Sequence, residues 1–558
     1  MTEISNFIKK EEPHLIKADG AFCSLNTVEY KGKLLYSKYN PKKTILTYIE
    51  NLQLLPGTII LLCSPLLFYG LDELLQKLPL NCKIIAFEAD KNLFDFSKNF
   101  LSESKKDIKF FNLSNILELD EYARKLVESG DYRRILSINF SAGIQFAKEK
   151  YEEVASGLQE IITVFWKNRI TLQKLGKLYS KNILKNLSYL KNSEQLFDKK
   201  NYVSKNILVC GAGESLDNFA HWNEVKDKFF IIAVDAAARS LCEKNVIPDA
   251  IVALEPQFAI QKSYIGLKKF FDKKEPVLFS DLCARNEVCN LFSKKIFFLS
   301  KFSESKFIKN LEDKKIVRSI IEPMGSVGLA ATYIALKIRE SENVKIFTLG
   351  LDFAFSAGKT HAKAAQASLN LFLLQNKFHS AQNYNACFSK NSISFCTKDE
   401  KISYTSEALK NYAIQFKNMF SKEKNIFNLS NFGFDTGLPF KADFDDFLNK
   451  ENKILKNEEL FVKSENSSMT KKIENFFAEE ILALEKAKSL LADGEKSEYR
   501  EKNLSLQEQL KSLLECRDYL YLHFPDGQKF SFEISFLKRI RAEINFFLKQ
   551  LKEASKNN

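Results

Sequence analysis

The chain has 558 residues, of which 45% are hydrophobic and 27% are charged, and its formal net charge is +13. This length is too great for one hydrophobic core and predicts about three domains, while the composition excludes wholesale disorder. The excess of Lys and Arg falls within the first 440 residues but is spread along them. Spread positive charge suits an anionic ligand or partner and gives no sign of nucleic-acid binding.

The sequence contains no membrane-spanning or targeting pattern. The longest apolar stretch begins at Gly57 and is shorter than the roughly 20 residues that a membrane span needs. Residues 1–12 lack the apolar core of a signal peptide. We therefore expect a cytoplasmic protein that does not associate with membranes.

Cysteine and histidine are too scattered to build a recognisable site. The ten Cys include no C-x-x-C pair, and only five His are present. This pattern predicts reduced thiols and neither a disulfide framework nor a His/Cys metal site. An all-carboxylate metal site stays open.

The first block, residues 1–190, has the pattern of an α/β domain. Continuous apolar runs at 57–63, 82–88 and 134–139 predict buried parallel strands of a doubly wound, Rossmann-like sheet. The second strand ends in Glu88, as in nucleotide- or methyl-donor-binding folds. The turn after the first strand lacks the G-x-G that lets a backbone approach phosphate, so the pattern favours a scaffold over a ligand site.

The central block, residues 200–445, repeats this pattern, with clearer turns after its strands. A strand at 207–210 leads into a turn that contains Gly211, Gly213 and Ser215. Such a turn at the start of a helix is typical of anion binding, because it offers backbone N–H groups and a hydroxyl. The next two strands end in Asp235 and Glu255, at the sheet edge where open α/β sheets bind ligands.

The second half of this block carries a second turn of the same kind. After two further apolar strands, Gly325 and Ser326 open a predicted helix at 329–336. The following strand, 344–349, leads to Asp352 and then to a loop with Thr360 and His361. These residues predict a ligand site at the carboxyl edge of a doubly wound central sheet.

Residues 446–558 change character. Apolar residues recur at helical spacing in 471–492, 504–522 and 531–552, with Lys and Glu between them. The pattern predicts an all-α helical bundle, and a docking surface for a partner protein is the alternative.

Four motifs occur in an order that resembles one family. They are Gly-Ala-Gly-Glu-Ser-Leu-Asp at 211–217, Ile-Pro-Asp…Ala-Leu-Glu-Pro at 247–256, Gly-Ser-Val at 325–327, and Leu-Gly-Leu-Asp-Phe-Ala-Phe-Ser-Ala-Gly-Lys-Thr-His-Ala at 349–362. The chain thereby resembles the Maf proteins, the motility associated factors, which are bacterial flagellin glycosyltransferases. Their central domain is similar to bacterial sialyltransferases that use a CMP-sugar without a metal.

The resemblance spans nearly the whole chain and implies three domains: an N-terminal α/β domain (1–190), a central catalytic domain (200–445) and a C-terminal helical domain (446–558). It implies transfer of a nonulosonic acid, of the pseudaminic or legionaminic acid type, from its CMP donor to Ser or Thr of flagellin. The CMP-sugar would be a substrate, with no cofactor and no metal.

The resemblance also assigns residues. It places at the nucleotide-sugar Gly211, Gly213, Ser215, Asp235, Glu255, Gly325 and Ser326. Asp235 and Glu255 are acidic where the sialyltransferases have amides. Asp352, Thr360 and His361 align with the stretch around the scissile bond and are the predicted catalytic residues. The sialyltransferases carry a catalytic His further on, where this chain has Tyr404 and its neighbours, so His361 or a carboxylate is left as the base.

Two other classes of function remain open at this level. The same superfamily includes a hydroxymethylpterin pyrophosphokinase type, which would use ATP with a metal held by acids such as Asp235, Glu255 and Asp352. A flagellin-binding assembly factor without catalytic activity is the other alternative.

Overall fold

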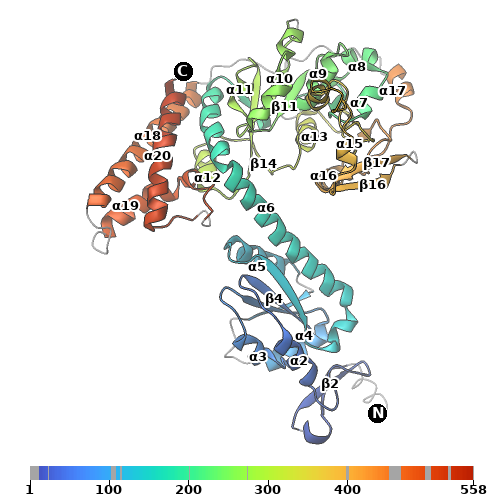
Figure 1. Ribbon diagram of the computed structural model, residues 1–558, viewed down its shortest axis with the longest axis vertical. Helices are drawn as coiled ribbons and strands as arrows, with labels where there is room; N and C mark the ends of the chain where they lie inside the picture. The colour runs from blue at the N-terminus through green and yellow to red at the C-terminus, as the bar shows by residue number, and fades with distance from the viewer. Residues whose placement is uncertain are drawn as a thin grey trace. The chain divides into compact units, whose positions relative to one another are not determined.

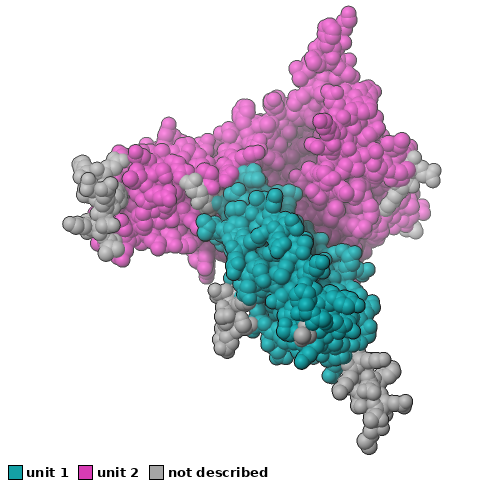
Figure 2. Space-filling view, turned by 60° about the horizontal axis from the view of Figure 1, so that its bottom comes forward, with its two compact units in different colours: residues 1–171 teal, residues 172–558 magenta. Residues whose placement is uncertain are grey.

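A computed structural model describes residues 12–22, 24–101, 108–113, 116–199, 202–272, 274–397, 401–450, 467–496, 504–525 and 529–556. The chain forms two compact units, residues 1–171 and 172–558, which Figure 2 distinguishes by colour. The long helix α6 (Lys148–Asn186) contains the boundary between them. The division into domains at 190, 200–445 and 446 stays a prediction.

Unit 1 is built on a parallel sheet with the strand order β6-β5-β4-β7. Its strands are β4 (Thr58–Cys63), β5 (Lys83–Glu88), β6 (Lys109–Asn112) and β7 (Arg134–Asn139). Every residue of β4 is buried, because alternate side chains pack on opposite faces. One face is covered by α2 (Lys43–Asn51) and α3 (Leu71–Gln76), and the other by α5 (Ile116–Glu128) and α6. The helix α4 (Lys91–Ser97) follows β5.

A small antiparallel sheet precedes this core. It consists of β1 (His14–Lys17), β2 (Asn26–Tyr30) and β3 (Lys33–Leu34). Tyr30 pairs with Lys33 across a two-residue turn, Lys31 and Gly32, in which both residues have positive φ. That geometry matches the twist of the strands that it joins.

Unit 2 contains a larger sheet whose strand pairs, among the described residues, are all parallel, with the order β14-β13-β12-β11-β10-β9-β15-β18 and β8 beside β13. The strands are β8 (Glu194–Gln195), β9 (Ile207–Cys210), β10 (Phe230–Val234), β11 (Ala250–Ala253), β12 (Val277–Asp281), β13 (Lys295–Ser300), β14 (Ile320–Ile321), β15 (Ile346–Leu349) and β18 (Ile426–Asn428). The chain builds outward from β9 to β14 and then returns to the other side of β9 with β15. The point where the strand order reverses therefore lies between β9 and β15, where doubly wound folds bind their ligands.

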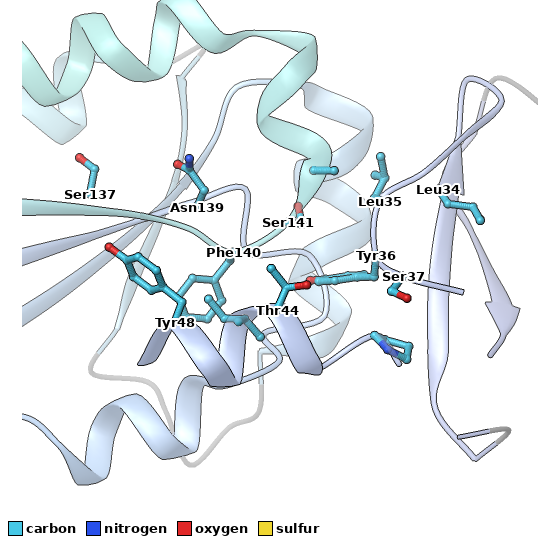
Figure 3. Close-up of a pocket in the computed structure, with 13 residues that line it drawn as sticks. Leu34, Leu35, Tyr36, Ser37, Thr44, Tyr48, Ser137, Asn139, Phe140 and Ser141 are labelled. Carbon is cyan, nitrogen blue, oxygen red and sulfur yellow. The ribbon is translucent and has the colours of Figure 1, made fainter. Parts of the chain in front are cut away.

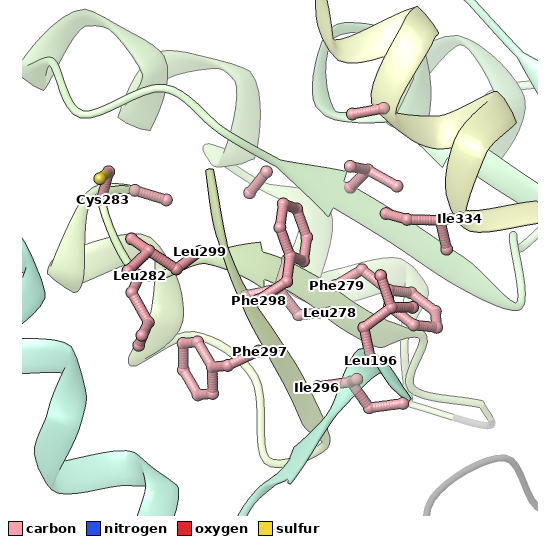
Figure 4. Packing of buried hydrophobic residues seen from close by; sticks show 14 of the residues in the cluster. Leu196, Leu278, Phe279, Leu282, Cys283, Ile296, Phe297, Phe298, Leu299 and Ile334 are labelled. Atoms are coloured by element: carbon pink, nitrogen blue, oxygen red, sulfur yellow. The ribbon is translucent and has the colours of Figure 1, made fainter. Parts of the chain in front are cut away.

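Helices cover the faces of this sheet. The helix α13 (Val327–Ile338) packs across β9, β10, β11 and β15, and α9 (Asp235–Cys242) packs against β10 and β11. Figure 4 shows part of the core. Phe279 of β12 and Ile296 of β13 lie there near Leu196, which follows β8, and near Ile334, which belongs to α13. The shorter helices are α7 (Ser215–Asn218), α8 (Trp222–Lys228), α10 (Gln261–Tyr264), α11 (Asn286–Cys289) and α12 (Lys306–Asp313).

A long insertion separates β15 from β18. It contains α14 (Gln366–Leu373), α15 (Tyr384–Cys387), the hairpin of β16 (Ser392–Cys396) and β17 (Ile402–Ser406), and α16 (Glu407–Phe420). The hairpin is tied back to the sheet edge, because Phe355 and Tyr404 exchange two backbone hydrogen bonds of 2.8 Å. The insertion thus stands beside the carboxyl end of β15.

The C-terminal part of unit 2 is helical. Figure 1 shows α18 (Ser467–Lys496), α19 (Leu504–Glu515) and α20 (Ile534–Lys556) grouped together, with α18 in contact with both others. The seven apolar residues that the spacing assigns to one face of the last helix are all buried: Phe536, Leu537, Ile540, Ile544, Phe547, Leu548 and Leu551. The predicted fold class is confirmed: two doubly wound α/β sheets and a C-terminal group of helices. Among the described residues, no helix combines the length and apolar character that crossing a membrane requires.

Candidate functional site

A cavity of about 380 Å³ lies at the point where the strand order reverses. Its walls come from the turn after β9, the loop after β15 and the start of α13. The sequence-predicted residues that line it are Gly211, Gly213, Ser326, Asp352, Thr360 and His361. The fold therefore brings together six residues that are up to 150 positions apart in the sequence. This cavity is the candidate active site.

The glycines of the first turn allow two loops to approach closely. The Gly211 amide donates to the carbonyl of Leu349 and the Gly213 amide to that of Gly350, both at 2.8 Å. A Cβ at Gly211 would overlap the carbonyl oxygen of Gly350, and one at Gly213 would overlap the Asp352 carboxylate. The sequence-based expectation that this turn offers open N–H donors is thus corrected for both glycines, whose amides are used within the protein.

Ser215 lies beneath the cavity and holds Asp352. Its backbone N–H donates to Asp352 Oδ2 at 2.9 Å, its hydroxyl donates to Asp352 Oδ1, and its Oγ accepts from the Gly350 amide at 3.0 Å. Burial raises the pKa of Asp352 to about 6, against the opposing effect of these hydrogen bonds. Ser215 is itself buried, so it positions Asp352 rather than facing the cavity.

Thr360 and His361 form a half-buried pair at the cavity wall. His361 Nδ1 lies 3.1 Å from Thr360 Oγ1. Burial lowers the pKa of His361 below its ordinary value, so the imidazole is neutral at neutral pH. In the tautomer that carries its hydrogen on Nδ1, Nδ1–H donates to Thr360 Oγ1 and leaves Nε2 as the proton acceptor.

Two carboxylates that the sequence analysis did not single out anchor this loop. Glu214 Oε2 accepts from the backbone N–H of Ser356 at 3.1 Å and also from its hydroxyl. Asp217 Oδ2 accepts from the Lys363 amide at 2.8 Å and pairs with Lys359 Nζ at 3.1 Å. Both acids belong to the motif at 211–217, and that membership was the only sequence signal for them.

The second Gly/Ser turn is arranged differently from the first. Ser326 caps α13, with its Oγ accepting from the Leu329 amide at 3.4 Å. Gly325 donates to Gln415 Oε1 at 3.2 Å and packs against Tyr412 of α16, so it supports the turn from outside the cavity. Because α13 has twelve residues, its N-terminus carries a substantial positive end of the helix dipole.

Asp235 and Glu255 do not line this cavity. Asp235 begins α9 and is buried; its Oδ1 accepts from the Ala236 amide at 2.7 Å, while its Oδ2 has no hydrogen-bond partner among the described residues. Burial raises the pKa of Asp235 to about 7, so this side chain is only partly ionised near neutral pH. Glu255 is exposed after β11, one strand further from the point of reversal.

The insertion adds a second, adjoining cavity of about 910 Å³. Thr360 and His361 line both cavities, so this pair stands between them. Asn383, which no sequence pattern indicated, lines the smaller cavity, and its backbone N–H donates to the Gly358 carbonyl at 2.9 Å. Among the described residues, no group of three His, Cys, Asp or Glu side chains is placed to hold a metal ion.

Unit 1 has a cavity of its own, about 640 Å³, beside the edge strand β7. Figure 3 shows Ser137, Asn139 and Ser141 around it together with Thr44 and Tyr48 of α2. The strand-end acid of this unit faces inward: Glu88 is fully buried, accepts from Ser64 Oγ at 2.8 Å and from the Ala89 amide at 3.0 Å, and binds the Tyr151 hydroxyl. That arrangement supports the scaffold interpretation of Glu88.

The similarities to known proteins agree with the fold. The family model described as 6-hydroxymethylpterin diphosphokinase MptE-like matches residues 181–358. An uncharacterized protein of Treponema pallidum (strain Nichols) is 28% identical over 97% of this chain and 95% of its own length. The solved structure of a Maf glycosyltransferase from Magnetospirillum magneticum AMB-1 covers 99% of this chain and 93% of its own, with a TM-score of 0.52 and 14% identity. The chain therefore has a Maf-like fold, and the resemblance in the motifs is confirmed at that level.

Proposed function

We propose that this chain is a glycosyltransferase that moves a nonulosonic acid from a CMP donor to a Ser or Thr hydroxyl of flagellin. The observation that carries the proposal is the cavity at the strand reversal, where Asp352, Thr360 and His361 meet the N-terminus of α13 in a Maf-like fold. The donor, the acceptor and the roles of individual residues are parts of this proposal.

The reaction exchanges one C–O bond for another. The bond between the anomeric carbon and the phosphate oxygen breaks, and its electron pair leaves with CMP. The N-terminus of α13 stabilises the charge that collects on the phosphate. The acceptor oxygen bonds to the anomeric carbon, and its proton passes to Nε2 of His361, whose Nδ1 is held by Thr360.

The three acidic residues predicted for the site then have separate roles. Asp352 is held by Ser215 and shapes the cavity floor. Asp235 and Glu255 lie outside this cavity. Any contact that they make with the donor therefore comes from the ends of the neighbouring strands β10 and β11. We expect turnover without an added divalent metal.

A second candidate function rests on the MptE-like match over residues 181–358. A pyrophosphokinase would transfer diphosphate from ATP to a hydroxymethylpterin and would need a divalent metal. The same strand-edge acids would serve it: Asp235, Glu255 and Asp352. Each candidate therefore predicts a different nucleotide in the same unit.

Calorimetric titration of the full chain separates the two. We expect CMP to bind in the presence of EDTA, and ATP with magnesium and hydroxymethylpterin to give no comparable heat. Magnesium-dependent ATP binding without CMP binding would favour the pyrophosphokinase. Flagellin binding with neither nucleotide would favour the non-catalytic assembly factor.

A further inference from the structure

The insertion after β15 carries an exposed apolar segment at the mouth of the candidate site. Residues 372–380 are all exposed, and among them Leu373 and Phe378 show 80% and 86% of their surface to solvent. The large exposed apolar side chains of this segment are Phe372, Leu373, Leu374, Phe378, Tyr384 and Phe388. So many within seventeen residues exceed the scattered apolar side chains of an ordinary surface. We call residues 372–388 the rim segment.

The rim segment is fixed beside the predicted catalytic pair. Phe372 and Gln382 line the 910 Å³ cavity together with Thr360 and His361. The backbone of Asn383 binds Gly358, and buried Cys387 directs its Sγ toward the Ser356 carbonyl at 4.0 Å. A large molecule whose hydroxyl reaches His361 from this side therefore passes over the rim segment.

The rim segment itself carries charge of one sign. The sequence contains no Asp or Glu between Asp352 and Asp399, while Lys359, Lys363, Lys377, Lys390 and Lys398 fall within that interval. The acids that line the adjoining cavity, Asp217 and Glu243, come from other segments. Lys359 is neutralised by Asp217. None of the ion pairs found among the described residues involves Lys377 or Lys390, which flank the apolar side chains. The complementary partner is thus apolar and acidic.

From these observations we propose that the rim segment is the docking surface for an apolar, acidic segment of the acceptor protein, which it holds while a Ser or Thr enters the cavity. This inference rests on the proposed function, because it takes the acceptor to be a protein. The apolar side chains supply the contact area, and the lysines orient the partner and exclude basic ones.

The test measures flagellin binding and transfer separately, with the full chain and unglycosylated flagellin as the probe. One variant combines Leu373→Ser with Phe378→Ser, neither of which lines a cavity described above. Its matched control combines Leu482→Ser with Ile534→Ser, two large apolar residues on the C-terminal helices that are also mostly exposed, at 69% and 67%. A third variant, Lys377→Glu with Lys390→Glu, tests the charge.

We expect the Leu373/Phe378 variant to raise the Kd and KM for flagellin about 10- to 100-fold. The affinity for CMP and the rate at which water hydrolyses the CMP-sugar stay within about twofold of wild type. The control pair behaves as wild type. The variant with Lys377→Glu and Lys390→Glu binds flagellin more weakly, and its affinity depends less on the salt concentration.

Unchanged flagellin affinity in both variants would overturn the proposal. A rim variant that converts a wild-type oligomer to monomers would also overturn it, because the surface would then bind a second copy of this chain. So would a rim variant that loses only its binding to phosphatidylglycerol vesicles, because the surface would then bind lipid. Failure of the proposed function looks different. Wild type would then bind flagellin through the rim segment but transfer no sugar to it.

Discussion

His361 depends on burial for the chemistry proposed for it. The side chain is half-buried between two cavities, and burial lowers its pKa below the ordinary value of 6.5. The imidazole is then already neutral, and able to accept a proton, near neutral pH. Thr360 fixes the ring by its contact with Nδ1.

Replacing His361→Gln is expected to lower sugar transfer about 10²–10⁴-fold while leaving CMP affinity nearly unchanged. Because the base must be neutral, the wild-type rate should rise with pH through a pKa below 6.5 and stay flat above it. The variant should lack this rise. Rates from pH 5 to 8 provide the measurement, and wild-type transfer by the variant would remove His361 from the mechanism.

Glu88 in unit 1 makes a separate prediction about stability. Burial raises its pKa from 4.5 to about 7, so the folded state holds a proton that the unfolded state releases. Stability is therefore complete below pH 4.5 and falls, by roughly 3 kcal/mol, as the pH rises to about 7. Glu88→Gln keeps the hydrogen-bond acceptor for Ser64 and should abolish this decrease.

Urea denaturation at several pH values checks the Glu88 prediction. Trp166 reports on unit 1 when Trp222, the other of the two tryptophans, is replaced by Phe in both proteins. The free energy of unfolding of Glu88→Gln minus that of its parent should grow from pH 5 to pH 7.5. A difference that does not vary with pH would show that Glu88 is ionised in the folded protein.

At the scale of elements, the turn after β9 and the loop at 356–363 act as one assembly. Glu214 and Asp217 bind the loop at both ends, and the Ala362 amide donates to the Ala212 carbonyl at 2.9 Å. This coupling explains why two motifs so far apart in the sequence carry complementary residues. Glycine, serine and acid in the first motif all serve contacts with the second.

The Asp217→Ala variant should therefore loosen this loop. We expect faster amide hydrogen exchange across 356–363 and about a tenfold slower transfer, with CMP affinity changed little. The control is Asp435→Ala, because Asp435 also accepts from a backbone amide, that of Gly437, and pairs with a lysine, Lys417. Equal exchange in the two variants would show that Asp217 does not hold the loop.

The sequence predicted the elements whose signals are local. Apolar runs such as 57–63 and 207–210 correspond to β4 and β9 to within one residue. Short or half-exposed strands such as β6 and β18 carry no such run and were not foreseen. Asp352 and His361 were found because they follow a strand, whereas Asn383 reaches the cavity through an insertion without periodic pattern.

At the scale of the whole chain, the C-terminal helices share one hydrophobic core with the larger sheet. Asp518 marks the junction, since its carboxylate accepts from Ser305 Oγ at 2.7 Å and from the Lys306 and Phe307 amides at 2.8 and 3.1 Å, at the start of α12. The pattern of amphipathic helices predicted a bundle, but no sequence pattern identifies the surface against which a bundle packs.

Asp518→Ala leaves the Ser305 hydroxyl and the Lys306 amide without their acceptor, while the Phe307 amide keeps Ser305 Oγ at 3.2 Å, and should lower the free energy of unfolding of unit 2 by about 1–3 kcal/mol. Glu515→Ala is the control, because Glu515 is paired with Lys306 but exposed and should matter little. Urea unfolding followed by Trp222 fluorescence, with Trp166 of unit 1 replaced by Phe in both proteins, gives the comparison. Equal midpoints for the two variants would mean that this junction does not stabilise the sheet.

Intact-mass spectrometry of flagellin shows whether the chain transfers a nonulosonic acid to it. Purified chain, CMP-nonulosonic acid and unglycosylated flagellin are incubated with EDTA. We predict flagellin masses that increase by whole nonulosonic acid residues, with one CMP released for each. Unmodified flagellin, together with magnesium-dependent transfer of diphosphate from ATP to hydroxymethylpterin, would show that the chain is a pyrophosphokinase and not a glycosyltransferase.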